Sequence, residues 1–229
     1  MRRILIGLCA AVLVAACGGG AASSPQEALA ATQASPVDPP ASDAPATSAA
    51  NAPATSAPAT SPGPTQVSGT ALPPFEQLED DPAVGRTPPV VIGTDLLTGE
   101  AVRIEAQGRP VVIAFYAHWC PHCQAEVDEL TEWLETNELP AGVVFAAVSV
   151  LEDPVRDNHP PKTWLAEQGW RHPVVADTPS SDVVAAFGLQ SVPFLVAVKP
   201  DNTVALRWAG NLGSDQLVGL FESLLAPGS

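Results

Sequence analysis

The amino-acid sequence predicts an α/β fold in three layers, in which a central mixed β-sheet is flanked by helices and extended at its N-terminal side by a β-hairpin. Two apolar runs of strand length, at residues 110–117 and 143–150, are typical of strands that are covered on both faces. A segment with helical periodicity separates these runs. A strand–helix–strand unit of this kind requires parallel strands and a right-handed crossover.

Each further element has its own signal in the sequence. Two β-branched runs around Thr98-Gly99 predict the N-terminal hairpin at 88–104. Pro121 suits the first position of the helix after the first buried strand, and "NELP" ends that helix near residue 136. The remaining elements are short helices at 160–168 and 180–188, a strand at 173–177, a hairpin at 193–210 with Pro200-Asp201-Asn202 in its turn, and an amphipathic helix at 214–226.

The N-terminus has the layout of a secretory signal peptide. Residues 1–16 place Arg2 and Arg3 ahead of an apolar run that is too short to cross a bilayer as a helix. The run ends in "LVAAC", which resembles the lipobox of bacterial lipoproteins, and this resemblance implies that Cys17 is acylated after cleavage. An ordinary signal cleavage that leaves Cys17 as a free thiol is the alternative. We therefore expect an extracytoplasmic protein that is lipid-anchored to the cell membrane.

Residues 17–74 are rich in Ala, Pro, Ser and Thr, and almost nothing in them could form a core. Such a composition cannot bury enough apolar surface to offset the entropy of ordering the chain, which predicts a disordered tether. Residues 75–229 are long enough to form one ordinary hydrophobic core. The predicted organisation is a signal peptide, a tether and a single folded domain.

The net charge and the positions of the cysteines limit the classes of function that the chain can have. The chain has 10 basic and 25 acidic residues, a net charge of −15, which argues against nucleic acid as a partner. Cys9 leaves with the signal peptide and Cys17 is assigned to the anchor, so Cys120 and Cys123 form the candidate pair in an oxidising compartment. A structural zinc site would need further ligands that no second Cys-x-x-Cys supplies. No metal and no cofactor are expected.

The cysteine pair lies in "FYAHWCPHCQAEVDEL", at the corner between the first buried strand and its helix. A thiolate attacks a disulfide, so a reactive cysteine needs groups that stabilise negative charge. Cys120 begins the helix, where unpaired backbone N–H groups and the positive end of the dipole point toward its sulfur. Pro121 costs nothing at the first helical position because its missing N–H is not needed there, and His122 adds a donor near the same sulfur.

The order of the elements, "WCPHC" and the later "SVP" make residues 85–227 resemble the thioredoxin superfamily, in particular its membrane-tethered TlpA/ResA/DsbE branch. The resemblance implies a thiol–disulfide oxidoreductase in which Cys120 forms a mixed disulfide with a cysteine-containing protein and Cys123 resolves it. It also implies a cis peptide bond at Pro193 beside the cysteines, with the main chain of Val192 pairing with the substrate as an added strand.

Glu126 is a further candidate on the predicted helix. At 100° per residue, Cys123, Val127 and Leu130 share one apolar stripe, and Glu126 falls inside it, about 40° from Leu130. A carboxyl on this buried side should have a raised pKa and could exchange a proton with Cys123. The alternative is that Glu126 only complements the helix N-terminus. The resemblance favours the first role, because an acid three residues after the second cysteine is a functional position in the TlpA/ResA branch.

The direction of electron transfer stays open at this stage. A Pro-His dipeptide also separates the cysteines of the oxidising DsbA proteins, whereas the TlpA/DsbE branch is often reductive and serves cytochrome c maturation. We expect a membrane or extracytoplasmic redox partner in either case. Trp119 is expected either in the core or as an apolar rim around the exposed sulfur. His118, His159 and His172 show no ligand spacing and are expected to be solvated.

Two other functions remain as alternatives. A copper-binding protein of the Sco type would use this fold, but those proteins have three residues between their cysteines and a distant histidine, and here two residues intervene. A soft copper(I) site made by the cysteines and a histidine is conceivable. A thiol peroxidase would need Thr or Ser three residues before the reactive cysteine, where this chain has Ala117.

Overall fold

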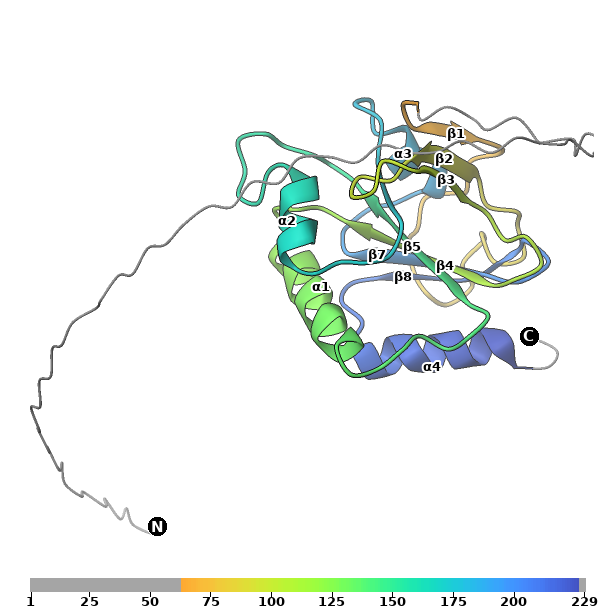
Figure 1. Ribbon diagram of the computed structural model, residues 1–229. Helices are drawn as coiled ribbons and strands as arrows, with labels where there is room; N and C mark the ends of the chain where they lie inside the picture. The colour runs from red at the N-terminus through yellow and green to blue at the C-terminus, as the bar shows by residue number, and fades with distance from the viewer. Residues whose placement is uncertain (1–62, 227–229) are drawn as a thin grey trace, which may run out of the picture. The chain divides into compact units, whose positions relative to one another are not determined.

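The computed structural model describes residues 63–226, which build two β-sheets and four helices (Figure 1). The strands are β1 (Gln66–Ser68), β2 (Val90–Thr94), β3 (Ala101–Ile104), β4 (Val111–Tyr116), β5 (Val144–Ser149), β6 (Val174–Ala176), β7 (Phe194–Val198) and β8 (Val204–Ala209). The helices are α1 (Pro121–Leu134), α2 (Pro161–Glu167), α3 (Asp182–Phe187) and α4 (Ser214–Leu225). In this part of the chain, no helix has both the length and the apolar character that a membrane span requires.

The central sheet has the strand order β6-β5-β4-β7-β8 and is mixed, as predicted. Strands β4, β5 and β6 run parallel, whereas β7 and β8 are antiparallel to their neighbours. All six residues of β4 are buried, because helices or the second sheet cover both of its faces. The loop after β4 therefore leaves the middle of the sheet, and the cysteine pair lies in that loop and the helix that follows.

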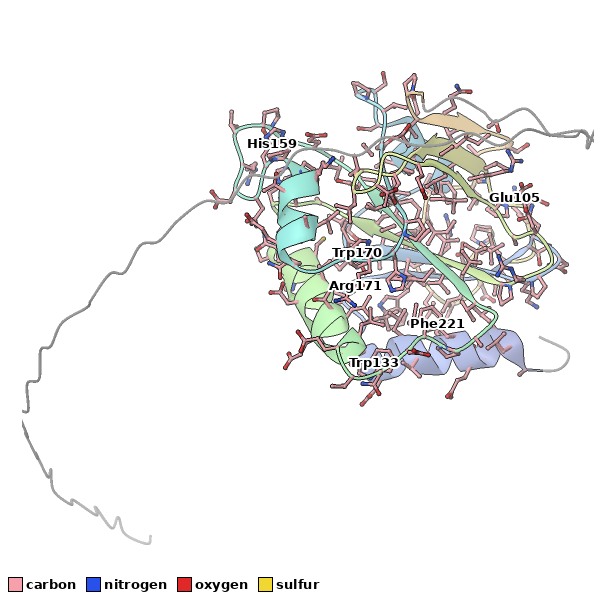
Figure 2. The ribbon with its side chains drawn as sticks, viewed as in Figure 1. Glu105, Trp133, His159, Trp170, Arg171 and Phe221 are labelled. Carbon is pink, nitrogen blue, oxygen red and sulfur yellow. The ribbon has the colours of Figure 1, made fainter. Side chains whose placement is uncertain are left out.

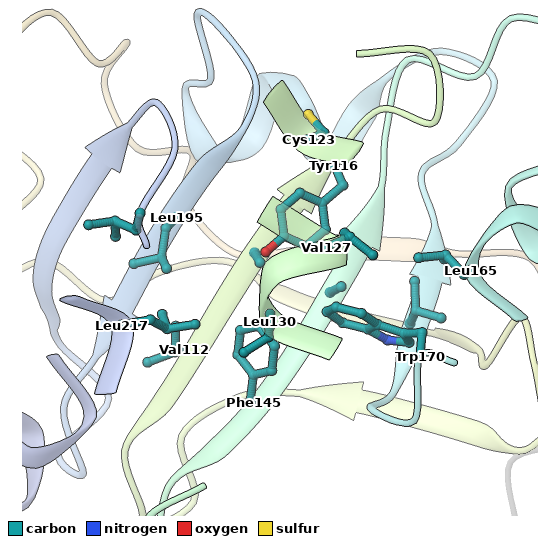
Figure 3. Packing of buried hydrophobic residues seen from close by; sticks show 14 of the residues in the cluster. Val112, Tyr116, Cys123, Val127, Leu130, Phe145, Leu165, Trp170, Leu195 and Leu217 are labelled. Atoms are coloured by element: carbon teal, nitrogen blue, oxygen red, sulfur yellow. The ribbon is translucent and has the colours of Figure 1, made fainter. Parts of the chain in front are cut away.

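Two hydrophobic clusters lie on opposite faces of the central sheet. Side chains of α1, α2 and α4 pack with Val112, Ala114 and Tyr116 of β4 on one face, part of which Figure 3 shows. Side chains of α3, β2 and β3 pack with Val111, Ile113 and Phe115 on the other face. This alternation along β4 confirms the three-layer α/β fold.

The N-terminal hairpin is confirmed and is larger than predicted. Strands β2 and β3 pair as an antiparallel hairpin with Gly99 at a φ of 78° in its turn, and β1 adds a third strand to this small sheet. An isolated bridge between Asp95 and Val175 joins the small sheet to β6. The predicted boundary of the folded domain at residue 75 is therefore wrong, because residues 66–68 form a strand and Leu72 is buried. The signal peptide, Cys17 and most of the tether lie outside the described residues.

A buried ion pair links residues 73–81, which precede β2, to β8. The guanidinium of Arg207 donates to both carboxylate oxygens of Asp81, at 2.8 and 2.5 Å, and to the carbonyls of Pro73 and Phe187. The side chains of Arg207 and Asp81 are 0% and 2% exposed. Burial alone would raise the pKa of Asp81, but the hydrogen bonds from Arg207 and from the Ala83 N–H outweigh it, and the pKa is lowered. The carboxylate is thus held ionised against the arginine.

We predict that Asp81→Asn lowers the free energy of unfolding by about 3 kcal/mol or more, because it leaves the Arg207 charge buried without its counter-ion. Chemical denaturation of the reduced protein at pH 7 measures this change. The neighbouring Asp80 is exposed, so Asp80→Asn is a matched control that should leave stability nearly unchanged. A loss below about 1 kcal/mol for Asp81→Asn would contradict a role for the pair in holding the segment.

Candidate active site

The sulfur of Cys120 lies over the open N-terminus of α1. Cys120 is the residue that caps the helix, and the backbone N–H of Cys123 donates to its Sγ at 3.3 Å. Pro121 occupies the first turn, as predicted, and the Cys120 thiol also donates to the carbonyl of Val192 at 3.6 Å. A helix N-terminus with an N–H aimed at a sulfur stabilises negative charge on that sulfur.

The two cysteines differ in access. Both are free thiols, but Cys120 keeps 5% of its surface exposed while Cys123 keeps none. Burial raises the pKa of the Cys123 thiol well above its usual range, and its hydrogen bond with Cys120 acts in the same direction. An incoming protein can therefore reach Cys120 first. Cys123, which is fully buried, can attack only the Sγ of Cys120, once that sulfur is part of a mixed disulfide.

The side chains predicted to surround the pair are distributed as follows. Pro121 and His122 are exposed, and the His122 carbonyl accepts a hydrogen bond from Asn211. Trp119 is half-buried, and its indole N–H donates to the carbonyl of Leu151 at 2.7 Å. Trp119 is thus fixed at the edge of the cysteine loop, with part of its surface in the core cluster.

The peptide bond between Val192 and Pro193 is cis, as the resemblance implied. Pro193 is buried and precedes β7, and its carbonyl accepts from the N–H of Gly210. Val192 is half-buried, and the fold brings its carbonyl to the Cys120 thiol across 72 positions of the chain. Cys120, Val192 and Pro193 therefore lie together, although the sequence separates them.

Glu126 is buried on α1, at 3% exposure, and both of its carboxylate oxygens accept hydrogen bonds. The hydroxyl of Tyr116 donates to Oε1 and the backbone N–H of Leu212 donates to Oε2, each at 2.8 Å. Burial raises the pKa of Glu126 to about 7, although these two hydrogen bonds favour the ionised form. The other acids of the helix, Asp128, Glu129, Glu132 and Glu135, are exposed, as the helical periodicity predicts.

Tyr116 is a site residue that the sequence analysis missed. It lies at the end of β4, and Figure 3 shows it close to Cys123 and Val127 at one end of the hydrophobic cluster. Full burial raises its pKa well above the usual range, and the charge of Glu126 adds to the effect, so its hydroxyl remains a donor. One signal was present in the sequence, because a tyrosine in a buried strand needs a polar partner and Glu126 was the carboxylate predicted on the facing helix.

The prediction that His118 is solvated is wrong. His118 is fully buried, its Nδ1 lies 2.7 Å from the carbonyl of Asp157, and its Nε2 accepts from the N–H of Asp153 at 3.1 Å. These partners select the neutral ring with its proton on Nδ1. The segment after β5 folds over His118 and encloses it. His159 is exposed, as predicted, and His172 is half-buried, where burial lowers its pKa.

Within residues 63–226, no three His, Cys, Asp or Glu side chains converge as they would around a metal ion. The alternative of a copper site is therefore not favoured by any cluster of ligands in this part of the chain. The arrangement that the fold does assemble is a thiol that keeps 5% of its surface exposed, a second, fully buried thiol behind it, and a buried carboxyl of raised pKa one helical turn further on.

Comparisons with known proteins agree with this geometry. Nucleoredoxin from Bos taurus is 29% identical over 122 residues, which cover 51% of this chain and 27% of nucleoredoxin. The chain thus spans about a quarter of the length of that curated relative. Two solved structures share the fold: a thiol:disulfide interchange protein of the thioredoxin family from Chlorobium tepidum TLS (20% identity, 62% of this chain and 97% of that chain, TM-score 0.51) and a DsbF homologue from Corynebacterium diphtheriae (18% identity, 68% and 99%, TM-score 0.52).

A model of the AhpC/TSA family matches residues 88–207, from the N-terminal hairpin to β8. The match includes both cysteines, Glu126 and the cis proline, and it spans more than half of the chain. The chain belongs to the AhpC/TSA family, and its fold is thioredoxin-like.

Proposed function

We propose that this protein is a thiol–disulfide oxidoreductase that exchanges the Cys120–Cys123 dithiol and disulfide with cysteine-containing proteins. One observation carries the proposal: the N–H of Cys123 donates to the sulfur of the more accessible Cys120 at the N-terminus of α1. An N–H aimed at a sulfur stabilises negative charge that develops on it, and a thiolate is the attacking species in disulfide exchange. The names of the nucleoredoxin and interchange-protein relatives are consistent with such chemistry.

In the reducing direction, the Cys120 thiolate attacks one sulfur of a substrate disulfide. A bond forms between Cys120 Sγ and that sulfur, and the other substrate sulfur leaves as a thiolate with the electron pair. Cys123 then loses its proton and attacks Cys120 Sγ, which forms the Cys120–Cys123 disulfide and releases the second substrate thiolate. The same steps in reverse oxidise a substrate dithiol.

Glu126 is the proposed acceptor of the Cys123 proton. Cys123 is fully buried, so water cannot serve as its base, and Glu126 follows it by one turn on the same face of α1. A group with a pKa near 7 can both accept and return a proton at neutral pH. Tyr116 and the Leu212 N–H are positioning groups, because they hold the carboxylate in place through its two oxygens.

The peroxidase alternative is not supported by the site, although the family as a whole is named AhpC/TSA. The position three residues before Cys120 is Ala117, which is fully buried and has no hydroxyl to bind a peroxide.

The proposal also places the protein outside the cytoplasm, lipid-anchored through Cys17, because of the "LVAAC" lipobox. Oxidative folding and cytochrome c maturation are both compatible with the chemistry. The reduction potential separates them: about −120 mV is typical of an oxidant and about −270 mV of a reductant.

We predict that Cys120→Ser abolishes reduction of a disulfide-containing test protein such as insulin, because no thiolate remains within reach of the substrate. Cys123→Ser should instead accumulate a mixed disulfide between Cys120 and the substrate, because the resolving thiol is missing. Turbidity assays and non-reducing mass spectrometry measure the two effects. Retention of exchange activity by Cys120→Ser, or hydrogen peroxide consumption without protein disulfide exchange, would overturn the proposed function.

We predict that the resolution step speeds up as pH rises through about 7, because Glu126 accepts a proton only when ionised. Glu126→Gln should remove this dependence and slow resolution about 100-fold at pH 8. Tyr116→Phe removes a donor to the carboxylate and should move the midpoint to higher pH. Stopped-flow release of glutathione from a Cys120–glutathione mixed disulfide gives these profiles. Glu132→Gln, on the solvent face, is the control, and an unchanged profile for Glu126→Gln would refute the role.

We predict that Cys17→Ser moves the protein from the membrane fraction to the soluble fraction of cells that express the full chain, because acylation needs the thiol of Cys17. Fractionation followed by immunoblotting measures the distribution. A variant that stays in the membrane fraction would show that another feature anchors the chain.

A further inference from the structure

The loop at residues 151–160, between β5 and α2, is hydrogen-bonded to the residues that precede Cys120. Figure 1 shows the chain between these two elements projecting beyond α2, and Figure 2 labels His159 in it. The ring of His118 forms hydrogen bonds with the backbone of Asp153 and of Asp157. The side chain of Asn158 donates a hydrogen bond to the His118 carbonyl at 3.2 Å. The carbonyl of Leu151 accepts from the Trp119 indole. The loop is thus fastened at several points to the two residues before Cys120.

This fastened loop exposes apolar side chains. Val155 is 90% exposed and Leu151 is 39% exposed, and these are two of the five exposed large hydrophobic residues in the described part of the chain. Single exposed apolar residues are common on protein surfaces. Here the loop is held by hydrogen bonds while the side chain of Val155 stays almost fully exposed, so this valine adds little to the hydrophobic core.

The exposed face of the loop is continuous with the surface around the reactive sulfur. The guanidinium of Arg156 lies 5.0 Å from the centre of the Trp119 ring, and Trp119 directly precedes Cys120. A depression of about 570 Å³ lies here, with a mostly polar lining made by Trp119, Pro121, Gln124, Arg156, Asp157 and Asn158, and Val155 lies beside it in the sequence. Val155 adjoins Arg156, and neighbouring Cα atoms are about 3.8 Å apart. A substrate cysteine bonded to Cys120 would therefore bring its neighbouring residues to Trp119 and to the loop that Trp119 contacts.

We propose that the loop at residues 151–160, together with Trp119, is a substrate-recognition surface that binds an apolar side chain next to the target cysteine of a polypeptide substrate. The inference rests on the proposed function and deepens it by naming the kind of sequence that the site selects. The occupant is a polypeptide because the reaction itself brings one to Cys120. Its contact residue is apolar because Val155 and Leu151 of the loop expose apolar side chains next to Trp119. His118 acts as a positioning residue by holding the loop in place.

The test uses the detergent-solubilised full chain carrying Cys123→Ser, so that adducts on Cys120 persist. Two short peptides compete for it: one has leucine on both sides of a single cysteine, and the matched peptide has serine in those positions. Each cysteine carries a thionitrobenzoate group as an aryl disulfide. The Cys120 thiolate attacks the peptide sulfur, a Cys120–peptide disulfide forms, and thionitrobenzoate leaves with the electron pair because it is the better leaving group. Mass spectrometry gives the adduct ratio, normalised to the ratio that glutathione gives with the same peptides.

We expect the native loop to favour the leucine peptide about fivefold, as partial burial of apolar side chains would give. Val155→Ser should bring the ratio close to one, whereas Val155→Ile should preserve it. Val84 is also an exposed valine but lies outside the loop, so Val84→Ser is the matched control and should preserve the ratio. All these substitutions lie on the surface and should leave the fold intact.

The remaining outcomes separate the two proposals. Equal adducts from both peptides with the native loop, or an equal effect of Val84→Ser and Val155→Ser, would overturn the recognition surface while leaving the oxidoreductase intact. An absence of adducts with either peptide would overturn the proposed oxidoreductase function and the recognition surface with it.

Discussion

The hydrogen bond from the Cys123 N–H to the Cys120 sulfur is the constraint on which the site depends. It exists only if α1 begins at residue 121 and points its first turn at the end of β4. The burial of β4 on both faces fixes the start of that loop, and the apolar stripe of α1 fixes the direction of the helix. The packing on both faces of the sheet thus determines where the Cys123 N–H lies relative to the Cys120 sulfur. The hydrophobic core and the redox chemistry are coupled at this point.

Glu126 shows how the same core accommodates a titratable group. One carboxylate oxygen accepts a hydrogen bond from Tyr116 of β4, and the other accepts one from Leu212 in the loop before α4. The carboxyl therefore links α1, β4 and that loop. A buried carboxyl with a raised pKa costs folding free energy above that pKa, because the unfolded chain ionises more easily than the folded one. A leucine at this place in the stripe would avoid the cost. The polar residue is consistent with a need to move a proton to and from a thiol that water does not reach.

The sequence was sufficient to predict the elements of the central sheet and the position of Glu126, because period and burial determine both. Strand β1 was missed, since Val67 and Leu72 are isolated apolar residues in a segment whose composition is typical of disorder. His118 was misjudged because its burial depends on a loop more than 30 positions away, and no local pattern reports such a contact. Local periodicity is enough to predict the helices and strands. Contacts between side chains that are distant in the sequence can be identified only from the folded structure.

Residues 85–96 also cover part of both edges of the central sheet. At β6, Leu96 donates its N–H to Val174 and Asp95 bridges Val175, while at β8 the backbones of Gly85 and Arg86 bond Val204. Open edge strands are templates on which foreign chains can add themselves. A protein that handles partly folded polypeptides, as proposed, would be surrounded by such chains. By covering part of both edges with its own backbone, the molecule leaves fewer unpaired strand groups on which such chains could add themselves.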